Sequence, residues 1–144
     1  MLAHNSCSKN LVRGNYKKGK KAKEDIFNCK ALQITQNTKT YKNNEYHNLN
    51  LKKPRIFDGF NENGIYEIKN VRYQPMTSQL NDYIEIAKYF KTNFFLLIKK
   101  RNELTKLTSK SLRAHIQGEI EEFEIEGEIW LKIPLYIHPK SGSK

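Results

Sequence analysis

Apolar residues recur at regular spacing in two stretches of the chain. Over residues 76–90 the large apolar side chains lie on one helical stripe, and Thr77 or Ser78 is available as the N-cap, so we predict a helix there. Residues 93–99 form a continuous apolar run of strand length. Such a run is typical of a strand that is covered on both faces.

Weaker periodicity predicts further elements. Residues 21–34 and 108–117 have helical spacing, and Gly118 ends the second of these helices. Residues 119–130 alternate imperfectly between acidic and apolar side chains, which suggests one or two edge strands. Residues 1–20 have little periodicity and are expected to form a poorly structured arm.

A β-hairpin is predicted over residues 55–71. Two short β-prone runs flank Asn61-Glu-Asn-Gly64, and Asn-Gly is the strongest local signal for a hairpin. A long polar loop, residues 35–53, precedes the hairpin. Because a helix separates the hairpin from the apolar strand at 93–99, the connection is a crossover, and we expect a mixed sheet covered by helices.

Basic residues are concentrated in the first part of the chain. The 144 residues include 26 Lys and Arg against 15 Asp and Glu, a formal net charge of +11. Residues 1–57 hold 13 of the basic and 3 of the acidic residues, and the rest of the chain is nearly neutral. Such a basic segment is either a solvated arm or a binding site for a polyanion. The length fits one domain, residues 21–144, preceded by a basic arm at 1–20.

Cysteine usage and hydropathy exclude several kinds of protein. Cys7 and Cys29 are the only cysteines, so neither a metal-binding quartet nor a disulfide framework is expected. We expect Cys29 to be a small core residue and Cys7 an incidental residue of the terminus. The chain lacks the roughly 18 consecutive apolar residues of a membrane helix, and no membrane span is expected.

Three residues of the hairpin can form one chemical site. Glu67 and Lys69 are two apart on one predicted strand and therefore share a face. Asp58 lies on the partner strand, where a loop with an even number of residues would place it opposite Glu67 or Lys69 and on the same face. Two carboxylates and an ammonium on one sheet face are costly to bury without partners.

A hard divalent cation would remove the repulsion between these carboxylates. Mg²⁺ accepts oxygen ligands such as Asp58, Glu67 and the backbone carbonyl of Ile68, with water completing its shell. Lys69 could then orient or deprotonate an attacking water and offset charge that develops on a phosphate. A cross-strand salt bridge on a solvated sheet is the alternative interpretation of the same residues.

The ordered motifs resemble a superfamily of nucleases. Asp58 followed by Glu67-Ile-Lys69 resembles the PD-(D/E)xK signature of restriction-endonuclease-like enzymes. Gln79 and Tyr83 lie one helical turn apart and resemble the Q-x-x-x-Y element of RecB-type members. The resemblance implies a metal-dependent nuclease in which Asp58 and Glu67 bind Mg²⁺ or Mn²⁺ and Gln79 and Tyr83 position the substrate.

The same resemblance implies a fold and a further metal ligand. The fold would be α/β (α+β), with a restriction-endonuclease-like αβββαβ core and a mixed central sheet flanked by helices. The first helix of this fold contributes an acidic residue, which corresponds to Glu24, with Asp25 and Glu45 as alternatives. Phe57 replaces the proline of the signature, but that proline shapes the strand and ligates nothing.

Four segments together are similar to restriction-endonuclease-fold toxin domains at the C-terminus of bacterial polymorphic toxins, such as contact-dependent inhibition and Rhs proteins. The segments are Ala31-Leu-Gln-Ile-Thr-Gln-Asn-Thr38, Arg55-Ile-Phe-Asp-Gly59, Tyr66-Glu-Ile-Lys-Asn-Val71 and Thr77-Ser-Gln-Leu-Asn-Asp-Tyr83. The similarity implies an endonuclease toxin that is delivered as part of a larger protein and acts in the cytoplasm of a target cell. It also implies a cognate immunity protein, acidic if it covers a basic groove.

DNA is the expected substrate of such a toxin. An RNase or tRNase on the same fold is the first alternative, because the same metal chemistry cleaves either backbone. A non-catalytic nucleic-acid-binding module that retains the fold is the second. Nothing in the sequence resembles an RNA-reading module.

Overall fold

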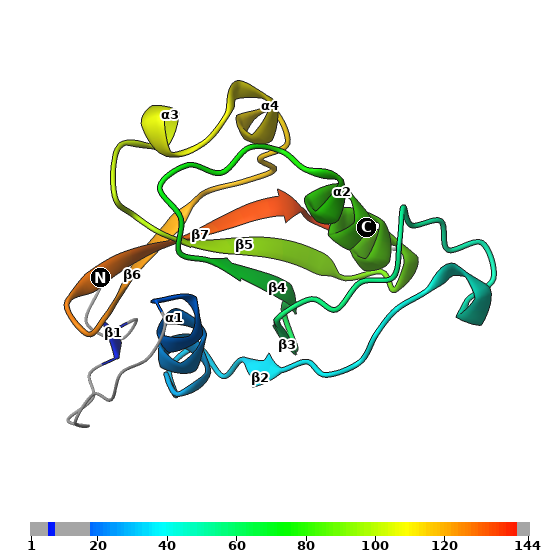
Figure 1. Cartoon of the computed structure of the whole chain (residues 1–144), viewed down its shortest axis with the longest axis horizontal. Coiled ribbons are helices and arrows are strands. Elements are labelled where there is room, and N and C mark those ends of the chain that lie inside the picture. Colours follow the sequence, from blue (N-terminus) through cyan, green and yellow to red (C-terminus); the bar gives the residue numbers. More distant parts are fainter. Residues whose placement is uncertain (1–5, 8–17, 141–144) are drawn as a thin grey trace.

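A mixed seven-stranded sheet with helices on both faces forms the body of the molecule (Figure 1). The computed structural model describes residues 6–7 and 18–140. The strand order is β1-β6-β7-β5-β4-β3-β2, and β4 and β5 run parallel to each other. In chain order the elements are β1 (Ser6–Cys7), α1 (Lys18–Phe27), β2 (Thr35–Gln36), the 3-10 helix η2 (Asn43–Glu45), β3 (Gly59–Asn61), β4 (Gly64–Lys69), α2 (Ser78–Tyr89), β5 (Asn93–Lys99), α3 (Leu104–Leu107), α4 (Lys110–Arg113), β6 (Glu121–Ile125) and β7 (Glu128–Tyr136).

The centre of the sheet is the apolar strand that the sequence predicts. The five interior residues of β5 are all buried, because β4 pairs on one edge, β7 pairs on the other and side chains cover both faces. Phe94, Leu96 and Ile98 belong to the core under α2, whereas Phe95 and Leu97 belong to the core under α1. This strict alternation explains why the run carries no polar residue: both faces of the strand are inside the protein.

The hairpin and the following helix also match their predictions. Asn61 pairs with Gly64 across a two-residue loop, so opposed positions sum to an odd number. The helix α2 is capped by the Thr77 hydroxyl, which accepts a hydrogen bond from the backbone N–H of Leu80 at 3.1 Å. The parallel β4–α2–β5 connection is the predicted crossover, and the predicted mixed sheet flanked by helices is confirmed.

Two helical predictions need correction. The helix expected over 21–34 spans 18–27 instead, and the chain turns before Cys29. Of the helix expected over 108–117, only residues 110–113 are helical, as α4, and a further short helix, α3, precedes Thr108. The backbone at this point forms a bridge with Gln74: the N–H of Gln74 donates to Leu107 and its carbonyl accepts from Ser109. This long-range pairing separates α3 from α4, and local spacing does not reveal it.

The terminal strands are longer and more central than predicted. β7 runs to Tyr136 and lies inside the sheet, between β5 and β6, so it is not an edge strand. Pro134 obscures it in the sequence, because proline cannot donate to a sheet ladder and usually excludes a central strand. The structure accommodates Pro134 opposite Phe95, where the β5–β7 register shifts.

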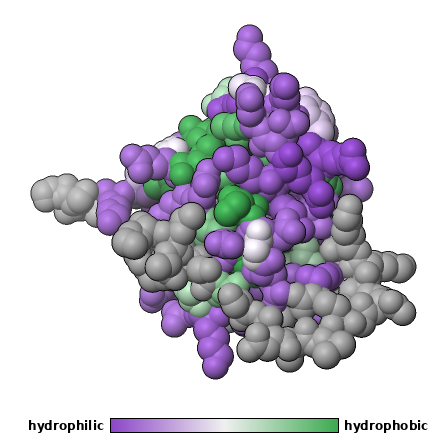
Figure 2. Space-filling model, turned by 90° about the vertical axis from the view of Figure 1, so that its left-hand side faces the viewer, coloured by the Kyte–Doolittle hydropathy of each residue, from purple (hydrophilic) through white to green (hydrophobic). Residues whose placement is uncertain are grey.

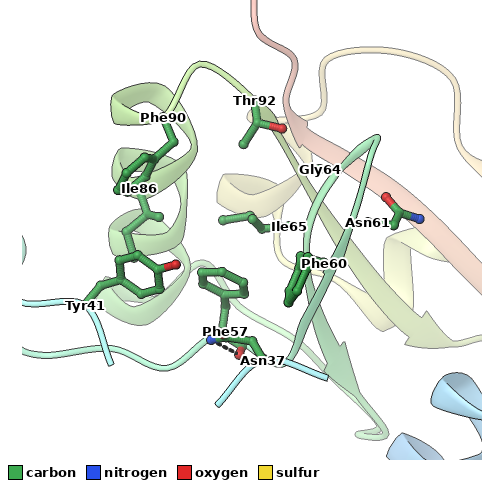
Figure 3. A pocket seen from close by; sticks show the side chains of 10 residues that line it. All are labelled: Asn37, Tyr41, Phe57, Phe60, Asn61, Gly64, Ile65, Ile86, Phe90 and Thr92. Atoms are coloured by element: carbon green, nitrogen blue, oxygen red, sulfur yellow. Dashed lines mark hydrogen bonds between the residues drawn. The ribbon is translucent and has the colours of Figure 1, made fainter. Parts of the chain in front are cut away.

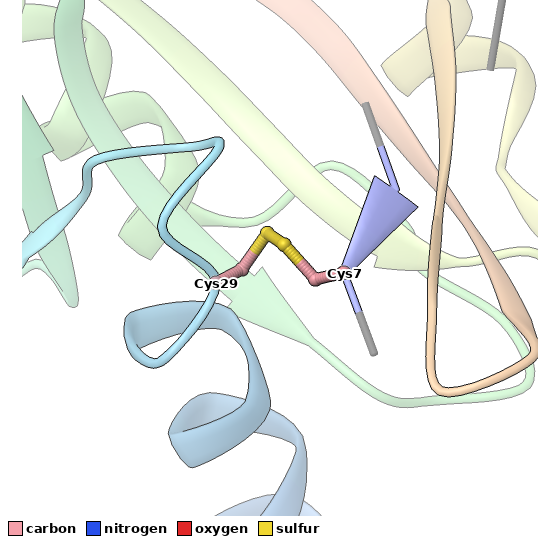
Figure 4. Close-up of a disulfide and its surroundings, with 2 residues drawn as sticks. All are labelled: Cys7 and Cys29. Atoms are coloured by element: carbon pink, nitrogen blue, oxygen red, sulfur yellow. A yellow bond between two sulfur atoms is a disulfide. The ribbon is translucent and has the colours of Figure 1, made fainter. Parts of the chain in front are cut away.

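A disulfide anchors the N-terminal segment, contrary to the prediction for the cysteines. Cys7 and Cys29 are bonded with their Cα atoms 5.4 Å apart, and they join β1 to the segment that follows α1 (Figure 4). β1 also pairs in parallel with β6. Part of the expected arm is therefore ordered, and most of the rest of residues 1–20 lies outside the described residues. None of the helices in the described part of the chain is long and apolar enough to cross a membrane.

The disulfide should contribute measurably to stability. It closes a loop with a sequence separation of 22 residues, and restricting the unfolded chain in this way stabilises a fold by about 3 kcal/mol. We expect Cys29→Ser, or reduction of the wild-type protein, to lower the free energy of unfolding in urea by this amount. A Cys7→Ser/Cys29→Ser double variant is the control, since reductant should not affect it. Equal wild-type stability with and without reductant would contradict the pairing.

Candidate active site

Asp58, Glu67, Lys69 and Gln79 meet at the carboxyl end of β4, between α1 and the N-terminal end of α2 (Figure 1). The hairpin register ends at Gly59 opposite Tyr66, and Asp58, directly before β3, donates its N–H to the Tyr66 carbonyl outside the regular ladder. Its carboxylate lies close to that of Glu67, whose pKa it raises, so the two predicted carboxylates are brought together. The surface at this end of the molecule is mainly hydrophilic (Figure 2).

Asp58 is held by the backbone of the neighbouring strand. Its Oδ2 accepts a hydrogen bond from the N–H of Ile68 at 2.8 Å, and its own N–H donates to the carbonyl of Tyr66 at 3.1 Å. Its second oxygen, Oδ1, lies 2.9 Å from the ammonium nitrogen of Lys23. The Asp58 side chain is 12% exposed, and its two oxygens are held by the backbone of β4 and by the partly exposed Lys23.

Glu67 is the most deeply buried charged group of the site, at 4% exposure. Its Oε2 lies 3.1 Å from the ammonium nitrogen of Lys69, whereas its Oε1 has no hydrogen-bond partner among the described residues. Burial and, to a smaller extent, the nearby charge of Asp58 raise the pKa of Glu67 from 4.5 to about 8, although the Lys69 ammonium partly opposes this. A buried carboxylate oxygen without a partner is costly, and it is free to accept a ligand.

Lys69 connects the sheet to the helix above it. Its ammonium donates to Oε1 of Gln79 at 2.9 Å while it pairs with Glu67. Gln79, predicted to position the substrate, therefore orients Lys69 in this structure. Because Gln79 lies in the first turn of α2, the capped start of that helix sets the position of the Lys69 charge.

Tyr83 supports the site from behind. Its side chain is buried, and its hydroxyl donates to the carbonyl of Ile56 at 3.1 Å, two residues before Asp58. Burial raises the pKa of Tyr83 above its usual range, and the charges of Glu67 and Asp58 act in the same direction. Tyr83 was predicted to position the substrate. In the structure its hydroxyl holds the backbone that leads to Asp58.

The segment before Asp58 has a second anchor that the sequence analysis missed. The guanidinium Nε of Arg55 lies 2.6 Å from Oδ2 of Asp82 on α2, and both side chains are buried. Oδ1 and Oδ2 of Asp82 also accept from the backbone N–H of Lys52. Arg55 and Asp82 both lie in segments that resemble the toxin domains. The sequence therefore marked both residues, although the sequence analysis did not infer that they form an ion pair.

The first helix contributes a cation at the place where an acid was predicted. Lys23, not Glu24, contacts Asp58. Of the alternative acids, Asp25 pairs with Lys21 at 2.7 Å, and Glu45 is exposed in η2. Within residues 6–7 and 18–140, no three His, Cys, Asp or Glu side chains are grouped so that they could hold a metal ion. The structure therefore does not bring Glu24 together with the other two carboxylates.

The remaining donor set fits a hard divalent cation. Oδ1 of Asp58 contacts the partly exposed Lys23, Oε1 of Glu67 has no hydrogen-bond partner among the described residues, and carboxylate oxygens are the ligands that Mg²⁺ and Mn²⁺ prefer. The N–H of Ile68 points toward Asp58, and the carbonyl of a strand residue points to the same side as its N–H. The Ile68 carbonyl is thus directed toward the two carboxylates, as the sequence analysis required.

The main apolar pocket is separate from this site. It has a volume of about 260 Å³ and lies between α2 and the hairpin, with walls that include Tyr41, Phe57, Phe60 and Phe90 (Figure 3). The side-chain amide of Asn37 at its edge donates to the backbone of Phe57, so this polar group is already used. None of the residues predicted for catalysis or metal binding lines this pocket.

The buried charge of Glu67 predicts a pH-dependent cost to stability. Because the pKa of Glu67 is about 8 in the fold and near 4.5 ordinarily, the folded state binds the extra proton, and stability should fall as pH rises between these values. Glu67→Gln removes this cost. We expect its free energy of unfolding, measured in urea with EDTA, to exceed the wild-type value by more than about 1.4 kcal/mol above pH 8.

The matched control for this measurement is Glu85→Gln. Glu85 also lies near a lysine, Lys88, but its side chain is 48% exposed, so its charge needs no compensation inside the protein. Its stability difference from wild type should stay near zero at every pH. A Glu67→Gln difference that did not grow between pH 5 and pH 9 would contradict the burial of an ionisable carboxylate.

Comparison with known proteins identifies the family. The family of restriction endonuclease fold toxin 7 matches residues 23–108, more than half of the chain. The match includes Lys23, Asp58, Glu67 and Lys69 and extends through α3. No curated protein matches the chain significantly, and no solved structure does. The chain belongs to the restriction endonuclease fold toxin 7 family, a family of nuclease-type toxins.

Proposed function

We propose that this domain is a metal-dependent endonuclease that hydrolyses phosphodiester bonds of nucleic acid. The observation that carries the proposal is the carboxylate of Glu67, buried beside Asp58 with one oxygen unpartnered and with Lys69 on the same strand face. Burying this charge destabilises a fold, and a purely structural sheet would be more stable with an apolar residue here. The arrangement is explained if the site exists to hold a cation and act on a phosphate.

Asp58, Glu67 and the carbonyl of Ile68 would hold Mg²⁺ or Mn²⁺. When bound, such a cation supplies Lewis-acid stabilisation of the phosphate and lowers the pKa of an attacking water. The protein fixes the geometry in advance, because the N–H of Ile68 holds Asp58 and the sheet holds Glu67. Preformed ligand positions of this kind avoid reorganisation during the reaction.

Lys69 would act on the reacting groups directly. Its ammonium is partly exposed, at 22%, and is held between Glu67 and Gln79. From this position it can orient an attacking water and offset negative charge that develops on the phosphate. Gln79 acts through Lys69 and is a positioning residue, and Tyr83 fixes the backbone before Asp58.

The biological setting follows from the family of nuclease-type toxins. We propose that the domain is delivered as part of a larger toxin and acts on DNA in the cytoplasm of a target cell. A cognate immunity protein would protect the producing cell. Since the first part of the chain carries most of the net charge of +11, an immunity protein that covers it should be acidic.

Substitution of the three central residues tests this function. We expect Asp58→Asn and Glu67→Gln to abolish nicking of supercoiled plasmid in Mg²⁺, and Lys69→Met to reduce it by about 10²–10⁴-fold. Chelation by EDTA should stop the wild-type reaction. Total RNA incubated in parallel distinguishes DNA from RNA as the substrate.

The control for cleavage is again Glu85→Gln, which should retain wild-type activity because Glu85 is exposed on α2. Glu67→Gln is informative for a second reason. It should be inactive and yet at least as stable as wild type above pH 8, so its loss of activity cannot arise from unfolding. Undiminished nicking by all three site variants would overturn the assignment.

A further inference from the structure

The position of Lys23 has no counterpart in the predicted site. Its ammonium nitrogen lies 2.9 Å from Oδ1 of Asp58. The other oxygen, Oδ2, is already used by the N–H of Ile68. Lys23 therefore covers the one oxygen of Asp58 that a metal ion could take.

The charges around this point balance without a metal ion. When both carboxyl groups are ionised, Asp58 and Glu67 contribute two negative charges, and Lys23 and Lys69 contribute two positive charges within salt-bridge distance. The ammonium of Lys23 is attracted by Glu67 as well as by Asp58. A divalent cation added beside an ammonium at this distance would experience strong like-charge repulsion, which is weakly screened where solvent is partly excluded.

We propose that Lys23 is a displaceable cation: it neutralises Asp58 in the metal-free protein, yields Oδ1 when a divalent cation binds, and then pairs with a phosphate of the substrate. This inference rests on the proposed function, because it concerns the same site. It adds a residue that controls metal affinity and a group that contacts the nucleic-acid backbone.

Lys23 is able to leave Asp58, whereas Lys69 is not. The Lys23 side chain is 47% exposed, and Asp58 is its only salt-bridge partner among the described residues. Lys69 is 22% exposed and is held by both Glu67 and Gln79. A lysine has a flexible four-carbon stem, so the ammonium of Lys23 can move to a nearby anion while α1 stays in place.

A phosphate is the partner that fits the displaced ammonium. The site opens at a mainly hydrophilic end of the molecule (Figure 2), and Lys23 is the last residue of the basic run 13–23. Each lysine that meets a phosphate releases condensed counterions and favours binding at low salt. Lys23 would thus add one phosphate contact at the metal site itself.

Metal binding without substrate gives the first test. Mn²⁺ is titrated calorimetrically into wild type, Lys23→Met, Lys23→Arg and Lys21→Met. Lys21 is the matched control, because it lies on the same helix but pairs with Asp25. We expect Lys23→Met to bind Mn²⁺ about tenfold more tightly than wild type, and Lys21→Met and Lys23→Arg to bind it within about twofold of wild type.

Nucleic-acid binding gives the second test. Each protein is titrated into a fluorescent oligonucleotide of the cleaved type, at saturating Mn²⁺, with phosphorothioate linkages in the oligonucleotide if cleavage interferes. Lys23→Met should bind about tenfold more weakly, and the slope of log affinity against log salt should decrease by about one. Tighter metal binding together with weaker nucleic-acid binding is a signature that a loss of folding would not produce.

The possible outcomes distinguish this inference from the proposed nuclease function on which it rests. Unchanged or weaker Mn²⁺ binding by Lys23→Met would overturn the displacement while leaving the nuclease assignment intact. Unchanged oligonucleotide affinity would overturn the phosphate contact. If no protein in the series binds Mn²⁺, the metal-dependent function fails, and this inference fails with it.

Discussion

The burial of one carboxylate, that of Glu67, is the constraint on which the other features of the site depend. Removing this group from water is costly, and its Oε1 receives no hydrogen bond among the described residues. The neighbouring elements reduce the cost only partly: β4 supplies Lys69, α1 supplies Lys23, and Asp58 adds a repulsive charge. The fold thus keeps a local instability that a cation can relieve. Such local costs are typical of functional sites, where stability is exchanged for a prearranged charge.

Helix α2 provides most of the support that keeps this arrangement in place. One end of it positions the Lys69 ammonium through Gln79, and one turn later Tyr83 holds the carbonyl of Ile56. Asp82, between them, binds Arg55 in a buried salt bridge. Three consecutive contacts from one helix therefore fix both sides of the site: the lysine on β4 and the segment that leads to Asp58. Supporting contacts of this kind keep reactive groups within the small tolerances that catalysis requires.

The parts of this picture that follow from short-range patterns could be predicted from the sequence. The hairpin register follows from a two-residue loop, β5 from one apolar run and α2 from one apolar stripe with its cap. The parts that failed depend on distant partners. Gln74 pairs with Thr108 and separates α3 from α4, and the disulfide joins Cys7 to Cys29, 22 residues apart in the sequence. Lys23 was missed for another reason. The nuclease resemblance implies an acidic residue on the first helix, so Glu24 was chosen, although the neighbouring Lys23 is the residue that contacts Asp58.

The family match covers the candidate site but not the strands that complete the sheet. Residues 23–108 contain the site and its supports, but they end before β6 and β7. Without β7, one edge of β5 would be unpaired and its apolar faces less covered, and such an exposed edge favours aggregation. The C-terminal strands and the disulfide-linked β1 therefore complete the sheet, and β7 also supplies Trp130, Leu131 and Ile133 to its two cores. The site itself lies within the matched residues, because its charges come from the side chains of Lys23, Asp58, Glu67 and Lys69.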